Sequence, residues 1–209
     1  MNSTEIRIAG FGGQGVILAG MILGRAASIY DGKYVTLTQS FGPEARGSAC
    51  SVQLIVSQQP VLYPYLTRAD ILVVMSQEAH ERFAAGLMPD GVLLYEEDLV
   101  RVNGTAHAGK AFGIPATHLA EELGRKLILN AVMVGFTTGI TGVTSPKAAR
   151  NAIRDLVPPG TDALNLAAFD KGLEFGLNRY GSAIQTQQAT VPEEASSMTF
   201  RANGSKHDS

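Results

Sequence analysis

The sequence predicts an α/β fold, a three-layer, doubly wound and mainly parallel sheet of the Rossmann-like type. Short runs of aliphatic and β-branched residues alternate with segments of helical periodicity. A glycine-dense turn at residues 10–15 joins the first such run to the first helical segment. Because 209 residues with 45% hydrophobic side chains suffice to bury one core, we expect one domain over residues 1–180.

Five short runs are predicted to be strands. Continuous apolar runs of this length are typical of strands that are covered on both faces, as in a parallel sheet. The predicted strands are residues 5–9, 33–38, 51–57, 70–76 and 91–95.

Six segments are predicted to be helices. Ser145 and Pro146 form a favourable N-cap and first-turn pair for one of them, and Gly32 suits the left-handed position that follows a helix. The predicted helices are residues 16–30, 77–86, 117–124, 127–141, 146–156 and 166–178.

Residues 181–209 are predicted to form a polar C-terminal tail. The segment is rich in Gln, Ser and Thr and has no sustained apolar period, so we expect it to be flexible in isolation. It could become ordered against a partner subunit, with residues 198–200 as its apolar anchor.

The charge and hydropathy of the chain exclude several functional classes. A net charge of −2 provides no basic field for nucleic acid or an anionic membrane surface. No run reaches the roughly 18 to 20 apolar residues of a membrane span, and the N-terminus has no signal-peptide pattern. We therefore expect a cytoplasmic protein.

The polar residues do not form a catalytic or metal-binding set. His80, His107 and His118 lack metal-ligand spacing, and the acidic residues 96–98 are predicted to form a solvated turn. Cys50 is the only cysteine, so this chain cannot by itself supply the thiolates of an iron–sulfur cluster. We expect no catalytic residue and no metal site in this chain.

The glycine turn fits the spacing of a dinucleotide-binding turn. Gly10, Gly12 and Gly15 match G-x-G-x-x-G between a predicted strand and a predicted helix. In such a turn the first glycine permits the reversal, the second lets an anion approach the backbone, and the third allows close packing of helix and strand. The free N–H groups at the helix start can then hold a phosphate.

Two alternatives to a phosphate site in another kind of protein remain open at this turn. A free-standing NAD- or FAD-dependent Rossmann oxidoreductase would place an acidic residue near residues 36–40, but no carboxylate occurs before Glu44. The glycines could also serve packing alone, with Gly20 and Gly24 extending a close helix contact.

Several motifs in one order carry a family resemblance that extends from about residue 6 to residue 176. The chain resembles the gamma subunit of 2-oxoacid:ferredoxin oxidoreductases of the pyruvate, 2-oxoglutarate and phenylglyoxylate type. Ser48 departs from the second glycine that often follows Arg46 and Gly47 in this family. The matching motifs are GFGGQGVILAG (10–20), TQSFGPEARG (38–47), YP (63–64), DILVVMS (70–76), IPAT (114–117), NAVM (130–133) and LNL (164–166).

The resemblance implies an accessory, non-catalytic role in a multi-subunit enzyme. Such a complex carries thiamine diphosphate, Mg²⁺ and [4Fe–4S] clusters on alpha and beta subunits and a ferredoxin-like delta subunit. It converts a 2-oxoacid, with 2-oxoglutarate and phenylglyoxylate both open here, to its acyl-CoA. Electrons pass to ferredoxin or, through a further flavin subunit, to NAD.

The resemblance also implies that this chain helps to bind the nucleotide half of coenzyme A. Arg46 is the candidate charge, because arginine binds phosphate through paired hydrogen bonds, although an ion pair with Glu44 or a subunit contact is an equal alternative. Asn130 is a weaker candidate, since it could instead cap a helix. The candidate binding residues are Gly12, Gly13, Gln14, Gly15, Arg46 and Asn130.

Overall fold

Six strands form one mixed sheet in the order β2-β3-β1-β4-β5-β6. The computed structural model describes the backbone of residues 3–40, 49–102 and 110–189, with side chains for residues 3–40, 50–102 and 110–181. The strands are β1 (Ser3–Phe11), β2 (Tyr34–Ser40), β3 (Ala49–Ser57), β4 (Ala69–Val74), β5 (Leu87–Glu96) and β6 (Ala111–Ile114).

The predicted α/β, mainly parallel architecture is confirmed, with one reversed strand among those described. The pairs β1–β4, β4–β5 and β5–β6 are parallel, whereas β3 runs antiparallel to both β1 and β2. Only eight residues separate Ser40 from Ala49. A parallel crossover needs a dozen or more residues, so β3 returns beside β2 in the opposite direction.

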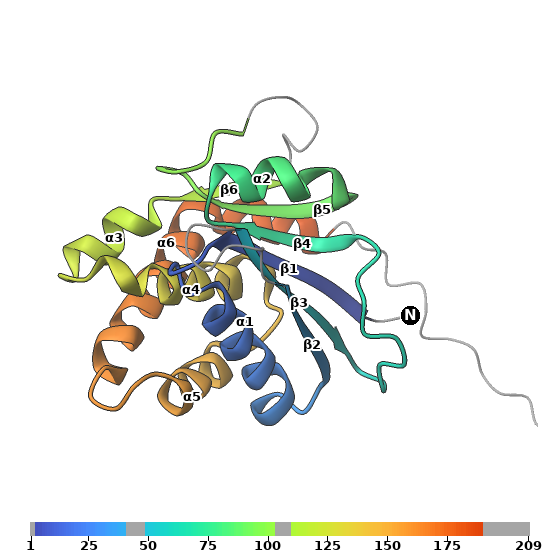
Figure 1. Ribbon diagram of the computed structural model, residues 1–209, viewed down its shortest axis with the longest axis horizontal. Coiled ribbons are helices and arrows are strands. Elements are labelled where there is room, and N and C mark those ends of the chain that lie inside the picture. The colour runs from blue at the N-terminus through green and yellow to red at the C-terminus, as the bar shows by residue number, and fades with distance from the viewer. Residues whose placement is uncertain (1–2, 41–48, 103–109, 190–209) are drawn as a thin grey trace, which may run out of the picture.

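Helices lie on both faces of the sheet and form the outer layers (Figure 1). On one side α1, α4, α5 and α6 pack over the larger core, and on the other side α2 covers β1 and β4. The helices are α1 (Val16–Arg25) with its π-helical extension η1 (Ala26–Tyr30), α2 (Gln77–Phe83), η2 (Ala84–Gly86), α3 (Ala116–Glu122), η3 (Lys126–Ile128), α4 (Leu129–Thr141), α5 (Pro146–Leu156) and α6 (Asp162–Ala189).

Most bounds of the predicted elements shift by a few residues, and two differences are larger. The edge strand β6 was not predicted, because four residues that include a glycine give no periodic signal. Helix α6 is longer than the predicted 166–178 and continues past Tyr180 to Ala189. A polar segment can extend a helix that is already nucleated and packed, since each added residue gains a backbone hydrogen bond. The predicted tail therefore begins within α6, and its anchor at 198–200 lies outside the described residues.

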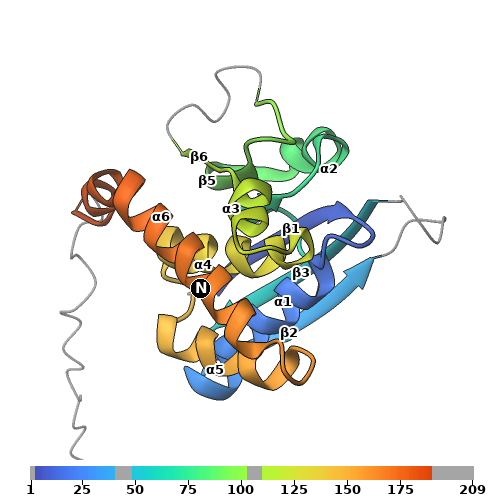
Figure 2. The same ribbon diagram turned by 90° about the vertical axis from the view of Figure 1, so that its left-hand side faces the viewer.

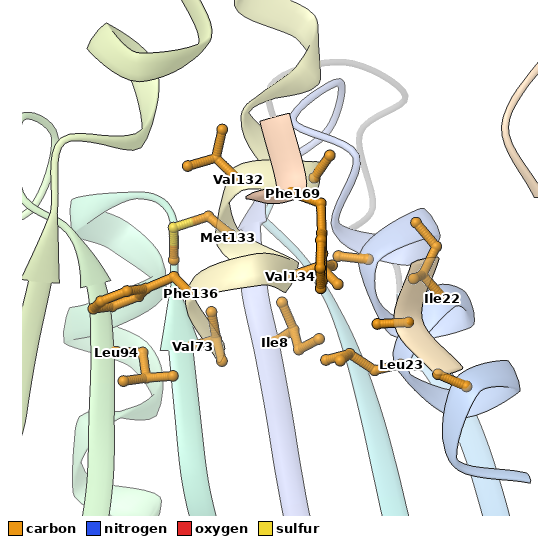
Figure 3. Close-up of a cluster of buried hydrophobic side chains, with 14 of the residues drawn as sticks. Ile8, Ile22, Leu23, Val73, Leu94, Val132, Met133, Val134, Phe136 and Phe169 are labelled. Carbon is orange, nitrogen blue, oxygen red and sulfur yellow. The ribbon is translucent and has the colours of Figure 1, made fainter. Parts of the chain in front are cut away.

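The larger core lies between the sheet and helices α1, α4 and α6 (Figure 3). Phe136 and Phe169 are fully buried there, and they meet Ile8, Val73 and Leu94 from the strands. Within the described residues, none of the helices has the length and apolar character needed to cross a membrane.

Two glycines bring α4 and α6 into direct backbone contact, which Figure 2 shows as α6 crossing over α4. A Cβ added at Gly135 would lie 1.9 Å from the carbonyl oxygen of Phe169, and one at Gly172 would lie 2.0 Å from that of Val132. This close crossing packs α4 directly against α6, and α4 contributes to the site described next.

Candidate functional site

The turn between β1 and α1 lies at the carboxyl end of β1, in the middle of the sheet. Gly13 has a φ of 97° and Gly15 a φ of 73°, a region in which side chains are strained. The Gln14 N–H donates to the Phe11 carbonyl at 3.2 Å and closes the turn. Gly12 and Gly13 are exposed, so their backbone is open to a ligand.

The Gln14 side chain fastens this turn to the neighbouring strand. Its Oε1 accepts a hydrogen bond from the Phe11 N–H at 2.7 Å, and its Nε2 donates to the Met75 carbonyl, just after β4, at 2.8 Å. A Cβ at Gly10 would lie 2.5 Å from that Oε1, so glycine is needed there for packing. Gln14 thus positions the turn and keeps only one N–H and one lone pair for other partners.

Gly15 and Asn130 lie against each other although 115 positions separate them in the sequence. A Cβ at Gly15 would lie 2.7 Å from the Asn130 side chain, which is 3% exposed. Asn130 does not cap α4: the N-cap position is Ile128, and no side-chain cap bond forms there. No hydrogen bond joins the Asn130 side chain to another described residue, so its amide is available to a ligand at the turn.

Two helices therefore begin beside the same turn. The first hydrogen bond inside α1 runs from the Ala19 N–H to the Gly15 carbonyl at 2.9 Å, which leaves the N–H groups of residues 16–18 without a partner in the helix. Neither α1 nor α4 has a side-chain cap bond or an acidic residue in its first turn. Each N-terminus carries a partial positive charge, so the arrangement favours an anion such as a phosphate.

The cation predicted for this site cannot be placed, because Arg46 lies outside the described residues. The segment leading into α4 carries two other cations that we did not consider from the sequence. Arg125 is exposed and forms no ion pair with a described carboxylate, whereas Lys126 lies 3.6 Å from Glu121. The available signal was a basic pair immediately before a long apolar helix.

The strand end that would hold a ribose-binding acid in a nicotinamide site carries none. β2 ends at Ser40, and residues 36–40 contain no carboxylate. Glu44, the next acidic residue, lies outside the described residues.

Of the acidic residues 96–98, which we predicted to form a solvated turn, only Asp98 is exposed in the turn at residues 97–99, and Glu96 precedes that turn. Glu96 is fully buried at the end of β5, where it accepts hydrogen bonds from the Thr117 N–H at 3.1 Å and the Leu99 N–H at 2.7 Å. Burial raises the pKa of its carboxyl group. Glu97 pairs with Arg179 on α6 at 3.0 Å, so both residues tie elements together.

The described residues contain no cluster of three or more His, Cys, Asp or Glu side chains that could hold a metal ion. Cys50 is buried in the core, and burial raises the pKa of its thiol. Among the described residues, the site offers backbone donors, the Asn130 amide and two helix N-termini.

Comparison with known proteins identifies relatives of the whole described domain. Residues 5–175 match the family described as pyruvate ferredoxin/flavodoxin oxidoreductase. The 2-oxoglutarate synthase subunit KorC of Methanothermobacter thermautotrophicus is 48% identical over 177 residues, which cover 82% of this chain and 94% of the relative. The ketoisovalerate oxidoreductase subunit VorA of the same organism is 33% identical over 152 residues, which cover 72% of this chain and 31% of VorA.

Solved structures show the same fold. The gamma subunit of a keto/oxoacid ferredoxin oxidoreductase from Geobacter sulfurreducens PCA has a TM-score of 0.74 and 38% identity, covering 84% of this chain and 99% of that one. A 2-oxoglutarate:ferredoxin oxidoreductase from Magnetococcus marinus, solved with 2-oxoglutarate, coenzyme A and succinyl-CoA bound, has a TM-score of 0.75 at 22% identity, covering 85% of this chain and 32% of that one.

Proposed function

Because this chain belongs to the pyruvate ferredoxin/flavodoxin oxidoreductase family, as a gamma subunit of a 2-oxoacid:ferredoxin oxidoreductase, we propose that its glycine turn binds the phosphates of coenzyme A. The observation that carries the proposal is the meeting of two helix N-termini without side-chain caps at Gly15 and Asn130. Coenzyme A carries a diphosphate and a 3′-phosphate, and such anions are stabilised by N–H donors at helix starts.

Each predicted residue has a distinct role in this proposal. The N–H groups of Gly12, Gly13 and Gly15 and of the first turn of α1 bind the diphosphate, and the Asn130 amide donates a further hydrogen bond. Gln14 holds the turn in place through Met75. Arg46 binds a phosphate through its planar guanidinium.

The acid substrate of the complex is proposed to be 2-oxoglutarate rather than phenylglyoxylate. Three KorC relatives, named as 2-oxoglutarate synthase subunits, share 44% to 48% identity with this chain over most of their length. Activity of the purified complex with 2-oxoglutarate, pyruvate and phenylglyoxylate, each with coenzyme A, tests this choice.

The chemistry itself is assigned to partner subunits of a cytoplasmic complex. When bound, thiamine diphosphate with Mg²⁺ supplies the carbanion that attacks the oxoacid, and [4Fe–4S] clusters carry the electrons. One buried cysteine cannot ligate a cluster that takes four thiolates, so we assign these groups to alpha, beta and delta subunits. The role of this chain is to bind and orient coenzyme A.

Substitution of Asn130 tests the site. Asn130→Asp keeps the shape of the side chain but places a carboxylate beside the phosphates, so we expect the KM for coenzyme A to rise about tenfold or more while kcat changes little. Arg46→Ala is expected to raise the same KM. Steady-state kinetics of the assembled complex, with calorimetric titration of coenzyme A, measures both effects.

Asn178→Asp is the matched control, because Asn178 is exposed on α6 and the change adds the same charge. The KM for coenzyme A of this variant should equal that of the wild type. If Asn130→Asp and Arg46→Ala also leave the KM unchanged in complexes with wild-type melting temperatures, the turn serves packing alone.

A further inference from the structure

One half of the sheet has a face that no described helix covers. One face of β2 and β3 packs against α1 and η1. On the opposite face of the sheet, α2 contacts β1 and β4. Gln53 of β3 points to this opposite side, where its Oε1 accepts a hydrogen bond from the Leu66 N–H at 3.3 Å. The irregular segment 58–68 therefore lies over this half of the sheet.

This segment exposes large apolar side chains. Leu62 is 95% exposed, Tyr63 is 66% and Tyr65 is 59%, and the two tyrosine rings make an edge contact with centroids 5.6 Å apart. Tyr34, at the start of β2, is 50% exposed. Tyrosines gathered in this way are typical of protein–protein interfaces, because they bury a large area at a low cost in side-chain entropy.

Two arginines are connected to this segment, Arg7 through Gln53 and Arg82 through the Phe83 ring on which both arginines stack. Arg7 faces Gln53 across the β1–β3 ladder. Its guanidinium stacks on the Phe83 ring of α2 at 4.7 Å, and that of Arg82 stacks on the same ring at 5.3 Å. The Nε of Arg7 is buried without a hydrogen-bond partner, and neither arginine forms an ion pair with a described acidic residue. Burial, and then the charge of Arg82, lower the pKa of Arg7.

An unpaired charge in this position is unfavourable until an anion reaches it. A partly buried guanidinium loses hydration that only a carboxylate or another acceptor can replace, and two adjacent cations repel each other. The exposed tyrosines add an apolar rim. The combination fits an acidic segment of another protein chain, with a carboxylate placed over Phe83.

We propose that this surface, which we name the 58–68 face, docks a neighbouring subunit of the oxidoreductase complex through a segment whose carboxylate pairs with two arginines. The surface is formed by Tyr34, Leu62, Tyr63, Tyr65, Arg7 and Arg82. In VorA the region that matches this chain fills 31% of a longer polypeptide. KorC of the same organism is named as a subunit and is matched over 94% of its length, so by analogy with KorC we take the contacts of this domain with the rest of the enzyme to be contacts between subunits.

Charge reversal at Arg82 tests the proposal without burying a new charge. Arg82 is exposed, so Arg82→Glu should fold normally while repelling the partner carboxylate. We expect the Kd for assembly with the remaining subunits to rise at least about tenfold. Leu62→Ser should weaken assembly by a smaller factor. Fluorescence anisotropy of the labelled full-length chain, titrated with the other subunits, measures both values.

The matched controls carry the same changes elsewhere on the surface. Arg154→Glu reverses an exposed arginine on α5, and Leu177→Ser replaces a leucine on α6 that is 49% exposed. Both should assemble like the wild type. If Arg82→Glu and Leu62→Ser assemble as tightly as these controls, with unchanged melting temperatures, the 58–68 face is not the docking surface.

Two further measurements identify the occupant. Hydrogen exchange of residues 58–68 should slow on assembly, whereas sedimentation of the isolated chain should show a monomer. A dimer that Arg82→Glu dissociates would instead assign the face to a second copy of this chain. The proposal rests on membership in the complex and not on coenzyme A binding: Arg82→Glu should leave the KM for coenzyme A unchanged, and Asn130→Asp should leave the assembly Kd unchanged.

Discussion

Gln14 and Asn130 are amides beside the same turn, yet they have different capacities left for a ligand. Both polar atoms of the Gln14 side chain already bind backbone groups at Phe11 and Met75. Asn130 is almost fully buried and binds no described residue. The Asn130 amide therefore keeps more of its hydrogen-bonding capacity for a ligand than the Gln14 amide does.

Asp31 shows how a single side chain can hold two elements together. It lies just after η1, and its carboxylate accepts hydrogen bonds from the Thr144 hydroxyl at 2.6 Å, the Ser145 N–H at 2.8 Å and the Ser145 hydroxyl at 2.7 Å. Ser145 is in turn the N-cap of α5, as its sequence position predicted. Burial alone would raise the pKa of Asp31, but these hydrogen bonds outweigh it and hold the pKa below its ordinary value.

Asp31→Asn is expected to destabilise the fold by about 1 to 3 kcal/mol at pH 7. The amide NH2 group would replace one acceptor oxygen and would lie against the hydrogen-bond donors of Thr144 or Ser145. The pKa of Asp31 is lower in the folded state than in the unfolded state. Its carboxylate therefore contributes fully to the free energy of unfolding at pH values above the ordinary pKa of an aspartate, about 3.9, and this contribution is lost as the pH falls through the folded pKa. The difference between wild type and variant should therefore shrink at acid pH. Urea unfolding at pH 7 and near pH 3 measures it.

Asp90→Asn is the control for this prediction, since the Asp90 side chain is 99% exposed. It should change the free energy of unfolding by only a few tenths of a kcal/mol at either pH. An Asp31→Asn variant that matches this control would show that the three hydrogen bonds contribute no net stability.

In the α4–α6 pair, two backbones are in direct contact, and α4 also reaches the site. Gly135 and Gly172 let the two backbones touch, and α4 then begins where Asn130 meets Gly15. The glycines of the turn and of α1 also serve packing: a Cβ at Gly20 would lie 2.5 Å from Val52 of β3. Close packing and ligand binding are thus compatible uses of the same glycine run.

Gly135→Ala is expected to destabilise the fold by about 2 kcal/mol or more. The added methyl group would overlap the Phe169 carbonyl and force α4 and α6 apart, and this outweighs the roughly 1 kcal/mol that alanine gains in a helix. Gly181→Ala is the control, because a Cβ there meets nothing within 4 Å, so it should be neutral or stabilising. Thermal unfolding gives the melting temperature of each variant. If both melting temperatures shifted in the same direction, close contact between the helices would be rejected as the cause.

At the scale of the whole molecule, the fold resembles a dinucleotide-binding domain without the full constellation of one. The turn lies at the carboxyl end of β1, but β2 ends without a carboxylate and β3 reverses direction beside it. The proposed coenzyme A site, formed by two helix N-termini together with partner subunits, accounts for the glycine turn. It does not require a nicotinamide site formed by this chain alone.

The isolated full-length chain is accordingly expected to show no saturable binding of NADH or FAD. The described residues provide no acidic side chain at the end of β2 to hold the ribose hydroxyls. Fluorescence titration of the chain with each nucleotide provides the measurement, with an NAD-dependent dehydrogenase as the positive control. Tight, saturable NADH binding together with hydride transfer would support the free-standing oxidoreductase instead.

The sequence alone determined the features that depend on neighbouring residues. Helix periodicity located α1 with η1, α2 with η2, and α5, and the turn chemistry placed Gly32 at a positive φ and Ser145 at an N-cap. The glycine spacing located the turn, and the ordered motifs identified the family. These signals are local, because periodicity and capping act within a few residues of one another.

Only the tertiary structure decided which distant residues meet. It reversed β3, buried Glu96 between β5 and α3, lengthened α6, and brought Asn130 to Gly15 and Arg7 to Arg82. No periodic pattern encodes these contacts, since each depends on how separate elements pack across the sheet. The candidate phosphate site and the 58–68 face are products of that packing.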